Sequence, residues 1–140
     1  MFRSGCLISM MCSSDSCRLL CTVTKINQAY AGFSGGIFDP QGHDGFHQYG
    51  SIGYQYWYKP LAPGGAKTAV LTINTGDQDR NYTISFSAVP GVTCTTCNVR
   101  DVWARKDLGP MASKITLALP RHDSGLLMTT PAGAGAVVEL

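Results

Sequence analysis

The stretch "KTAVLTINTGDQDRNYTISFSA", residues 67–88, contains two runs in which apolar and polar side chains alternate with a period of two. Side chains at positions i and i+2 share one face of a β-strand, so each run predicts a strand. In residues 67–74 the alternation puts Ala69, Leu71 and Ile73 on one face and Thr68, Val70 and Thr72 on the other. We expect two half-buried strands, with the polar residues 76–81 between them as a hairpin turn.

The second run, residues 81–88, divides in the same way. Tyr82, Ile84, Phe86 and Ala88 form the predicted inward set, and Asn81, Thr83, Ser85 and Ser87 the outward set. Asn81 and Thr83 belong to an Asn-Tyr-Thr glycosylation sequon, and the alternation exposes both. Asn81 is therefore a candidate glycosylation site if the chain enters the secretory pathway.

Further short runs lie on either side of this pair and are separated by Gly, Pro, Asn and Asp. They are residues 54–59, which enter a Pro/Gly turn at 60–65, residues 113–119 with Ile115, Leu117 and Leu119 inward, and residues 124–130 and 136–140. The pattern predicts an all-β protein. We expect an antiparallel β-sandwich of about seven or eight strands with Greek-key-like connections, formed by residues 47–140.

Residues 1–46 read as a short helical or irregular leader followed by a linker. Residues 15–26 could form the end of a helix with Leu19, Leu20, Val23 and Ile26 on one face, and residues 31–45 are typical of a linker. The apolar patch from Cys6 to Cys12 resembles a short signal peptide interrupted by Ser9. The alternative is an irregular leader, or a start assigned too late in a longer protein.

Composition limits the classes of function. With 140 residues the chain has the size of one domain and is too short for a complete (β/α)8 barrel. A net charge of +2, from 11 basic and 9 acidic residues, provides no stripe that could neutralise a nucleic-acid backbone. No apolar run reaches the length of a membrane span. We expect neither nucleic acid nor membrane as a partner.

Six cysteines raise the question of a metal or redox site. Only Cys94 and Cys97 form a C-x-x-C, and a zinc site needs about four converging ligands. The pair lies between two β runs, whereas a thioredoxin-like motif opens a helix. A disulfide that closes the loop and two free thiols both remain possible, and the redox states of Cys6, Cys12, Cys17 and Cys21 stay open. We expect no metal and no cofactor.

The histidines do not suggest a catalytic or metal site. His43 and His47 lie in a Gly-rich stretch, where their spacing of four implies no shared helical face, and we expect both on the surface. His122 follows Pro120 at the start of a strand, and the spacing identifies no nucleophile beside it.

Acidic residues were considered as a glycosidase pair, which needs two carboxylates on either side of the scissile bond. The candidates lie in predicted turns or near the end of the chain: Asp39, Asp77, Asp79, Asp107 and Glu139. Asp101 shares strand parity with Val99 and Trp103, so it should point inward and need a partner. We expect an ion pair with Arg100 or Arg105, or a bond to backbone amides, in preference to catalysis.

Four segments together resemble a known family. They are "INQAYAG", "YWYKPLAPGGAKTAVLTIN", "NYTISFSAVPGV" and "VRDVWARKDLG", and in this order they resemble the C-terminal part of the glycoside hydrolase family 27 α-galactosidases, or melibiases, over roughly residues 19–131. Asn27 and Gln28 match the pair that ends the catalytic barrel of that family. Matches in the early strands are Lys59, Pro60, Leu61, Ala69, Val70 and Asn74. The most specific match is Val99, Arg100, Asp101, Trp103, Lys106, Asp107, Leu108 and Gly109.

The resemblance implies a role without catalysis. The motifs that carry the two catalytic aspartates of the family do not occur in this sequence, so no catalytic residue is transferred and the chain alone should be inactive. The implied role is the accessory β-sandwich of an enzyme that hydrolyses terminal α-D-galactosyl residues, with its (β/α)8 barrel as the partner. In this role Trp103 should pack and Asp101 should fix a corner. The resemblance also favours a Cys94–Cys97 disulfide and suggests a secreted or lysosomal/vacuolar location.

The alternative is a free-standing carbohydrate-binding module. Tyr54, Tyr56, Trp57 and Tyr58 could form an exposed ridge, with Tyr56 and Trp57 as the candidates for stacking on sugar rings. The competing interpretation is that alternate members of this run belong to the core and the others cover the barrel. A docking face without its barrel would also favour self-association.

Overall fold

The computed structural model describes residues 15–40 and 53–133. Its elements are helix α1 (Asp15–Gln28) and strands β1 (Gly36–Ile37), β2 (Tyr54–Ala62), β3 (Lys67–Asn74), β4 (Arg80–Ser85), β5 (Thr96–Asp101), β6 (Lys106–Ala112), β7 (Lys114–Leu119) and β8 (Ser124–Pro131). Two single 3-10 turns, Pro63–Gly65 and Phe86–Ala88, follow β2 and β4. The predicted strand at 136–140, together with His43, His47, Cys6, Cys12 and Glu139, lies outside the described residues.

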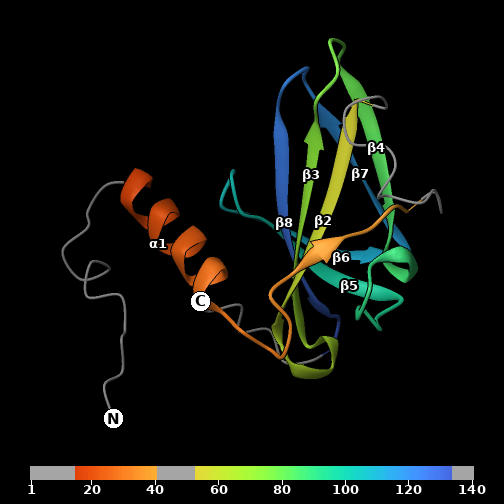
Figure 1. Cartoon of the computed structure of the whole chain (residues 1–140). Helices are drawn as coiled ribbons and strands as arrows, with labels where there is room; N and C mark the ends of the chain where they lie inside the picture. The colour runs from red at the N-terminus through yellow and green to blue at the C-terminus, as the bar shows by residue number, and fades with distance from the viewer. Residues whose placement is uncertain (1–14, 41–52, 134–140) are drawn as a thin grey trace.

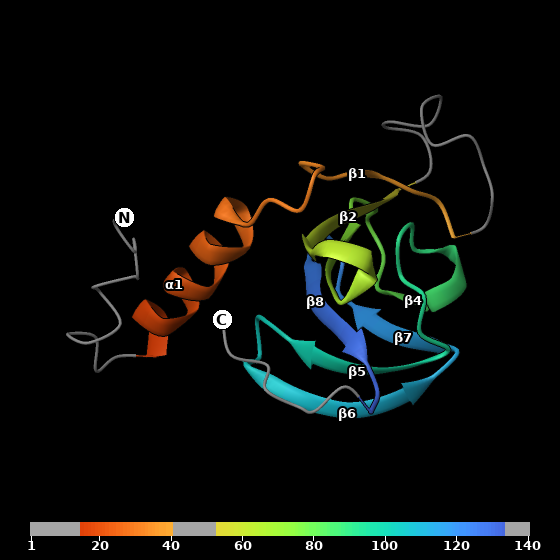
Figure 2. The same ribbon diagram turned by 90° about the horizontal axis from the view of Figure 1, so that it is seen from below.

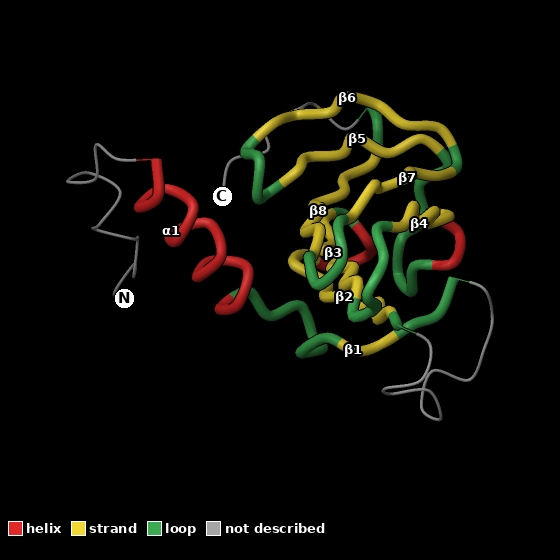
Figure 3. Tube along the Cα trace, turned by 90° about the horizontal axis from the view of Figure 1, so that it is seen from above, coloured by secondary structure: helices red, strands yellow, loops and turns green. Residues whose placement is uncertain are grey.

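The strands form two antiparallel sheets. The larger has the order β1-β2-β3-β8-β5-β6, and the smaller pairs β4 with β7. Seen along the strands, the larger sheet curves around the β4–β7 pair (Figures 2 and 3). The prediction of an antiparallel sandwich is confirmed, with eight strands among the described residues.

Residues 76–81 do not form the predicted hairpin. β3 pairs with β2 and β8, whereas β4 pairs with β7, so the chain leaves the larger sheet after Asn74 and enters the smaller one at Arg80. Asn74 organises this crossing. Its amide nitrogen donates to the carbonyl oxygens of Gln78 (2.9 Å), Leu119 (3.2 Å) and Pro120 (2.8 Å), and its carbonyl oxygen accepts from the Gly76 amide (3.1 Å).

The main core lies between the two sheets. Its buried members are Phe38, Tyr56, Val70, Tyr82, Ile84, Phe86, Val89, Cys97, Val99, Ile115, Leu119 and Leu127. The predicted inward sets of residues 81–88 and 113–119 are confirmed for Tyr82, Ile84, Phe86, Ile115 and Leu119, while Leu117 is half-buried. Phe86 reaches the core from a 3-10 turn, because β4 ends at Ser85.

A second apolar cluster lies on the outer face of the larger sheet, against α1. It contains Ile26, Ala69, Val102, Leu126 and Met128, with Leu19, Val23, Leu61 and Leu71 packed beside them. In Figure 1 the helix runs beside the sandwich on this side. β3 is therefore covered on both faces: Val70 belongs to the inter-sheet core and Ala69 to the helix contact. Leu20 does not join the predicted helical face, since it is 64% exposed.

The linker interpretation of residues 31–45 is wrong for residues 36–38. Gly36 and Ile37 form β1, which pairs with Tyr58 and Trp57 of β2. The next residue, Phe38, is buried in the inter-sheet core and contacts Tyr56 with a ring-centroid distance of 5.7 Å. The glycine-rich sequence concealed an edge strand, because two residues are too few to show an alternating pattern.

Candidate functional surface

An open groove of about 430 Å³ lies between α1 and the outer face of the larger sheet. α1 contributes Val23, Ile26 and Asn27, and the sheet contributes Trp57, Lys59, Ala69, Leu71 and Leu126. Ser34 and Gly35 close one side and Trp103 another. Both tryptophans of the chain thus line one groove, and both are partly open to solvent, Trp57 at 36% and Trp103 at 39%.

Strand alternation explains why Trp57 faces this groove. Tyr56 points between the sheets, so Trp57 must point to the opposite face of β2. Its indole nitrogen donates to the side-chain oxygen of Gln55 at 3.2 Å. Two residues on, Lys59 donates from Nζ to the backbone oxygen of Asn27 at 2.6 Å. A cation at the carboxyl end of a helix is favourable, so Lys59 ties the end of α1 to β2.

The exposed ridge of four aromatic residues, which the carbohydrate-binding alternative required, does not exist. The competing interpretation, that alternate members of the run belong to the core, agrees with the burial of Tyr56 and the packing of Tyr54 and Tyr58 against it. Tyr56 is 2% exposed within the inter-sheet core, and Tyr54 and Tyr58 pack against that core. Tyr56 lies edge-on to Tyr54 (5.3 Å) and Tyr82 (6.2 Å), which leaves no ring face for a sugar. Burial, with Tyr54 as the next cause, raises the pKa of Tyr56 far above its ordinary value. Stacking by Tyr56 is therefore ruled out in this conformation, and Trp57 stays a candidate.

The β5–β6 hairpin differs from its predicted side-chain arrangement. β5 keeps its alternation to its end at Asp101, so Val102 follows on the outer face that α1 covers. The register irregularity lies in β6, where Leu108 has no partner in β5. Val102 consequently becomes the buried residue, whereas Trp103 points outward and is not packed in the core. The sequence did not single out Val102, because its burial depends on the packing of α1 on the outer face of the sheet.

Asp101 has a local role in this hairpin. Its Oδ1 accepts a hydrogen bond from the Ala104 amide at 2.9 Å, which stabilises the turn. Of the partners proposed for Asp101, the structure thus shows a backbone amide. An ion pair instead joins Arg100 and Asp107 at 2.8 Å across the two strands. Asp107 therefore lies in β6, not in the turn where the sequence placed it.

Three other described acidic residues are also used in local contacts. Asp79 accepts from the Arg121 amide at 3.0 Å, and Asp123 accepts from the Ser124 amide at 2.7 Å. Asp77 lies 3.1 Å from the ring of His122, with both side chains largely exposed. Such exposed carboxylates with turn-forming roles do not make a glycosidase pair. Within residues 15–40 and 53–133, no group of three or more His, Cys, Asp and Glu side chains could hold a metal ion.

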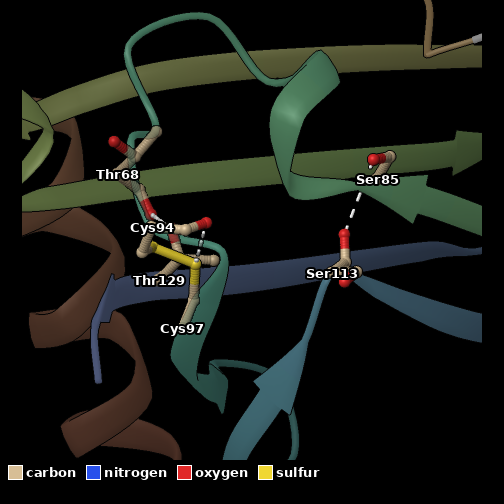
Figure 4. Close-up of a disulfide and its surroundings, with 6 residues drawn as sticks. All are labelled: Thr68, Ser85, Cys94, Cys97, Ser113 and Thr129. Carbon is tan, nitrogen blue, oxygen red and sulfur yellow. Dashed lines mark hydrogen bonds between the residues drawn. A yellow bond between two sulfur atoms is a disulfide. The ribbon is translucent and has the colours of Figure 1, made fainter. Parts of the chain in front are cut away.

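Cys94 and Cys97 form a disulfide, which Figure 4 shows at the start of β5. Their Cα atoms are 5.5 Å apart, and Cys97 is fully buried in the inter-sheet core. The bond closes a short loop at the end of the connection from β4 to β5. Its buried position beside the sandwich core indicates a structural role. Cys17 of α1 is also disulfide-bonded.

The sequon lies on the outer face of the small sheet. Asn81 and Thr83 are both exposed on β4, as the alternation predicted. Thr83 is hydrogen-bonded through its hydroxyl to that of Thr116 on β7 at 2.8 Å. The Asn81 side chain is therefore accessible to solvent, and its glycosylation stays a prediction. Among the described residues, no helix is long and apolar enough to cross a membrane.

Comparison with known proteins identifies the family. A family model described as the alpha galactosidase C-terminal beta sandwich domain matches residues 51–129. A search of curated proteins found no match. Among solved structures, α-galactosidase I from Mortierella vinacea has a TM-score of 0.61 and 20% identity, over 88% of this chain and 30% of its own. A family 27 β-L-arabinopyranosidase from Geobacillus stearothermophilus has a TM-score of 0.53 and 22% identity, over 61% and 19%.

These structural likenesses establish the fold. The chain spans less than a third of the length of each of these enzymes. The match of the family model covers more than half of the chain, from the residues before β2 into β8. The chain belongs to the family of α-galactosidase C-terminal β-sandwich domains.

Proposed function

We propose that this chain is the non-catalytic accessory end of an α-galactosidase-like glycoside hydrolase, whose parent activity is hydrolysis of terminal α-D-galactosyl residues. In this proposal residues 1–46 are the exit from a (β/α)8 barrel and a linker, except that residues 36–38 belong to the sandwich, and residues 47–140 are the rest of the accessory domain. The observation that carries the proposal is the apolar outer face of the larger sheet, where α1 packs on Ala69 and Leu126.

A two-sheet sandwich needs apolar residues only between its sheets, because its outer faces are usually solvated. Here the outer face of β3 and β8 is apolar as well, and α1 covers only part of it. The likeness to the Mortierella enzyme covers 88% of this chain, more than the stretch from β1 to β8 contains. The likeness reaches beyond the strands, which supports the interpretation of α1 as a piece of the barrel that stays packed on the sandwich.

A graft tests this docking role. Residues 15–133 would replace the equivalent segment of the Mortierella α-galactosidase, and the hybrid would be assayed on an aryl α-galactoside. We expect a folded, active hybrid whose thermal stability falls when Trp57→Ala and Trp103→Ala are introduced together. The matched control is Thr83→Ala, on the far sheet, which should leave the stability unchanged. If the double substitution leaves the thermal stability of the hybrid unchanged, docking through the groove is contradicted.

The chain alone should not hydrolyse the same substrate. Asp79, Asp101 and Asp123 accept hydrogen bonds from backbone amides, and Asp107 forms an ion pair with Arg100. Turnover by residues 1–140 that Asp101→Asn abolishes would overturn this part of the proposal.

Carbohydrate binding is the second candidate, and the position of the tryptophans favours it. Trp57 and Trp103 line one groove together with the polar side chains of Asn27, Ser34 and Lys59. Aromatic rings with nearby hydrogen-bonding groups are the usual components of a sugar site. A glycan array would show binding that Trp57→Ala removes and Tyr56→Phe, in the core, retains. A blank array would leave docking as the use of the groove.

The same open face would promote self-association of the isolated chain. Sedimentation at increasing protein concentration should show a rising average mass for the natural chain. The Trp57→Ala, Trp103→Ala double variant should remain monomeric over the same range. Equal behaviour of the two proteins would exclude this face as the contact.

A further inference from the structure

A second cleft, of about 680 Å³, lies between α1 and the β5–β6 hairpin and is distinct from the apolar groove. Its lining includes four cationic side chains: Arg18 and Lys25 from the helix, and Arg100 and Arg105 from the hairpin. Cys21, Thr22, Val102 and Ala104 complete the described lining, in which no residue is acidic. Four of the eleven basic residues of the chain thus meet in one cavity, although the net charge is only +2.

The helix presents its part of the cleft as a single stripe. Arg18, Cys21, Thr22 and Lys25 have the spacing i, i+3, i+4 and i+7, which places them on one helical face. The Thr22 hydroxyl bonds back to the Arg18 carbonyl oxygen at 3.1 Å. Cys21 is buried at the base of this stripe. Arg18 and Lys25 therefore lie two turns apart on the helical face that lines the cleft, with the buried Cys21 between them.

The hairpin presents guanidinium groups from the opposite side. Arg100 is held by Asp107 at 2.8 Å and its side chain is 28% exposed, so its head group is already partly positioned. Arg105 follows in the turn with φ of 53°, a left-handed conformation that is unfavourable for a residue with a side chain. The buried Val102 between them forms the apolar wall of the cleft. Asp107 offsets the charge of Arg100, and Arg105 takes part in a further interaction within the chain. A concave site in which cations still outnumber the acidic groups described around them attracts an anion.

We propose that this cleft is a binding site for a phosphate or sulfate group. Planar guanidinium groups match the oxygens of these anions through paired hydrogen bonds, and a lysine adds a point charge. The cavity has the size range of sites for small ligands. A nucleic acid is a poor fit, because the cations are confined to one cleft and form no track along the surface.

Titration of the full chain with inorganic phosphate at constant ionic strength tests this site. In a Trp57→Phe background, the fluorescence of Trp103, which precedes Ala104 in the cleft wall, reports binding. We expect saturation with a dissociation constant on the order of 1 mM, as for a small ion held by a few charge-assisted hydrogen bonds. Arg18→Gln and Arg105→Gln should each weaken binding about tenfold.

Arg121→Gln is the matched control, because it removes the same charge from an exposed position in the β7–β8 connection. It should change the affinity by less than about twofold. If Arg18→Gln and Arg121→Gln lower the affinity for phosphate equally, the effect comes from net charge and the proposal is overturned. A titration that does not saturate would also overturn it. Acetate that competes as well as phosphate would overturn it too. A hexose phosphate that binds more tightly than free phosphate would identify the ligand as an ester, whereas equal affinity would identify the free ion.

Discussion

Asn74, at the end of β3, donates a hydrogen bond to the backbone oxygen of Leu119, at the end of β7, and so joins the larger sheet to the smaller one. The side chain is fully buried, and its other partners all belong to the two loops that cross between the sheets. One amide group therefore holds both crossings together. This relationship identifies the position at which the sandwich is closed.

Replacement of Asn74 by Ala should lower the free energy of unfolding by about 2–4 kcal/mol, because one buried and two partly buried carbonyl groups and one amide lose their partner. Urea denaturation monitored by circular dichroism would measure the loss. Thr75→Ala, at the exposed neighbouring position, is the control and should cost less than about 0.5 kcal/mol. If Asn74→Ala is as stable as this control, the side chain does not close the sandwich.

Two buried threonines should respond in opposite directions to the same substitution. The hydroxyl of Thr72 is buried and has no hydrogen-bond partner in the described structure, whereas that of Thr129 donates to the Thr68 carbonyl oxygen at 3.3 Å. Thr72→Val should stabilise the protein by about 1 kcal/mol, because it removes an unsatisfied polar group without changing the shape. Thr129→Val should destabilise it by about 1 kcal/mol. Urea midpoints that shift in the same direction would contradict this difference.

The hairpin carboxylates should also differ. Asp101→Ala should cost about 1 kcal/mol through loss of the bond to the Ala104 amide. Asp107→Ala should cost less, since its ion pair with Arg100 is largely exposed on the carboxylate side and solvent screens it. Unfolding measured at low and at high salt separates the two effects. At high salt, the free energy of unfolding of the Asp107→Ala variant alone should approach that of the natural protein. If the Asp101→Ala variant does so instead, these roles are wrong.

Strands β2, β3, β4, β7 and β8 were predictable because each has a local signal. The alternation in residues 81–88 identified Tyr82 and Ile84 as core residues before any partner strand was known. The pairing was not predictable, since the residues between Asn74 and Arg80 look like a hairpin turn whether the next strand pairs or crosses. Asn74 had been noted only as a match to the family, and its hydrogen bonds depend on two distant loops.

The candidate surface was predictable in part. Strand parity correctly separates Trp57 from Tyr56 once one of them is known to be buried, yet the sequence alone could not say which. The position of Trp103 was not predictable, because Trp103 lies in the turn after β5 ends at Asp101, where strand parity no longer applies. The cationic cleft was beyond sequence reasoning, since Arg18 and Arg105 are brought together only by packing of α1 on the sheet.

We propose that Asn81 carries an N-linked glycan when the chain passes through a secretory pathway, because Asn81 and Thr83 are both exposed on β4. Secretion from a eukaryotic host should give a product whose mass falls after treatment with peptide N-glycosidase F. Asn81→Gln should abolish the shift, and Thr83→Ala should do the same through the sequon alone. A secreted product without a mass shift would reject the site.

Buried tyrosines should make the fold sensitive to alkali. Burial raises the pKa of Tyr56, and also that of Tyr54 and Tyr82, above the ordinary value of 10.0. Above pH 10 the unfolded chain releases the phenol proton while the folded chain retains it, so stability falls as the pH rises. One such group contributes a slope of at most about 1.4 kcal/mol per pH unit.

Tyr56→Phe should therefore make the loss of stability above pH 10 shallower, because the ring stays in the core and the ionisable group is removed. Tyr30→Phe is the control, since Tyr30 is 71% exposed and contributes no buried phenol. Urea unfolding from pH 8 to pH 11, with absorbance at the tyrosinate band, measures both the stability and the ionisation. If the two variants follow the same curve, ionisation of Tyr56 is not coupled to unfolding, and alkaline loss of the fold must start at another group.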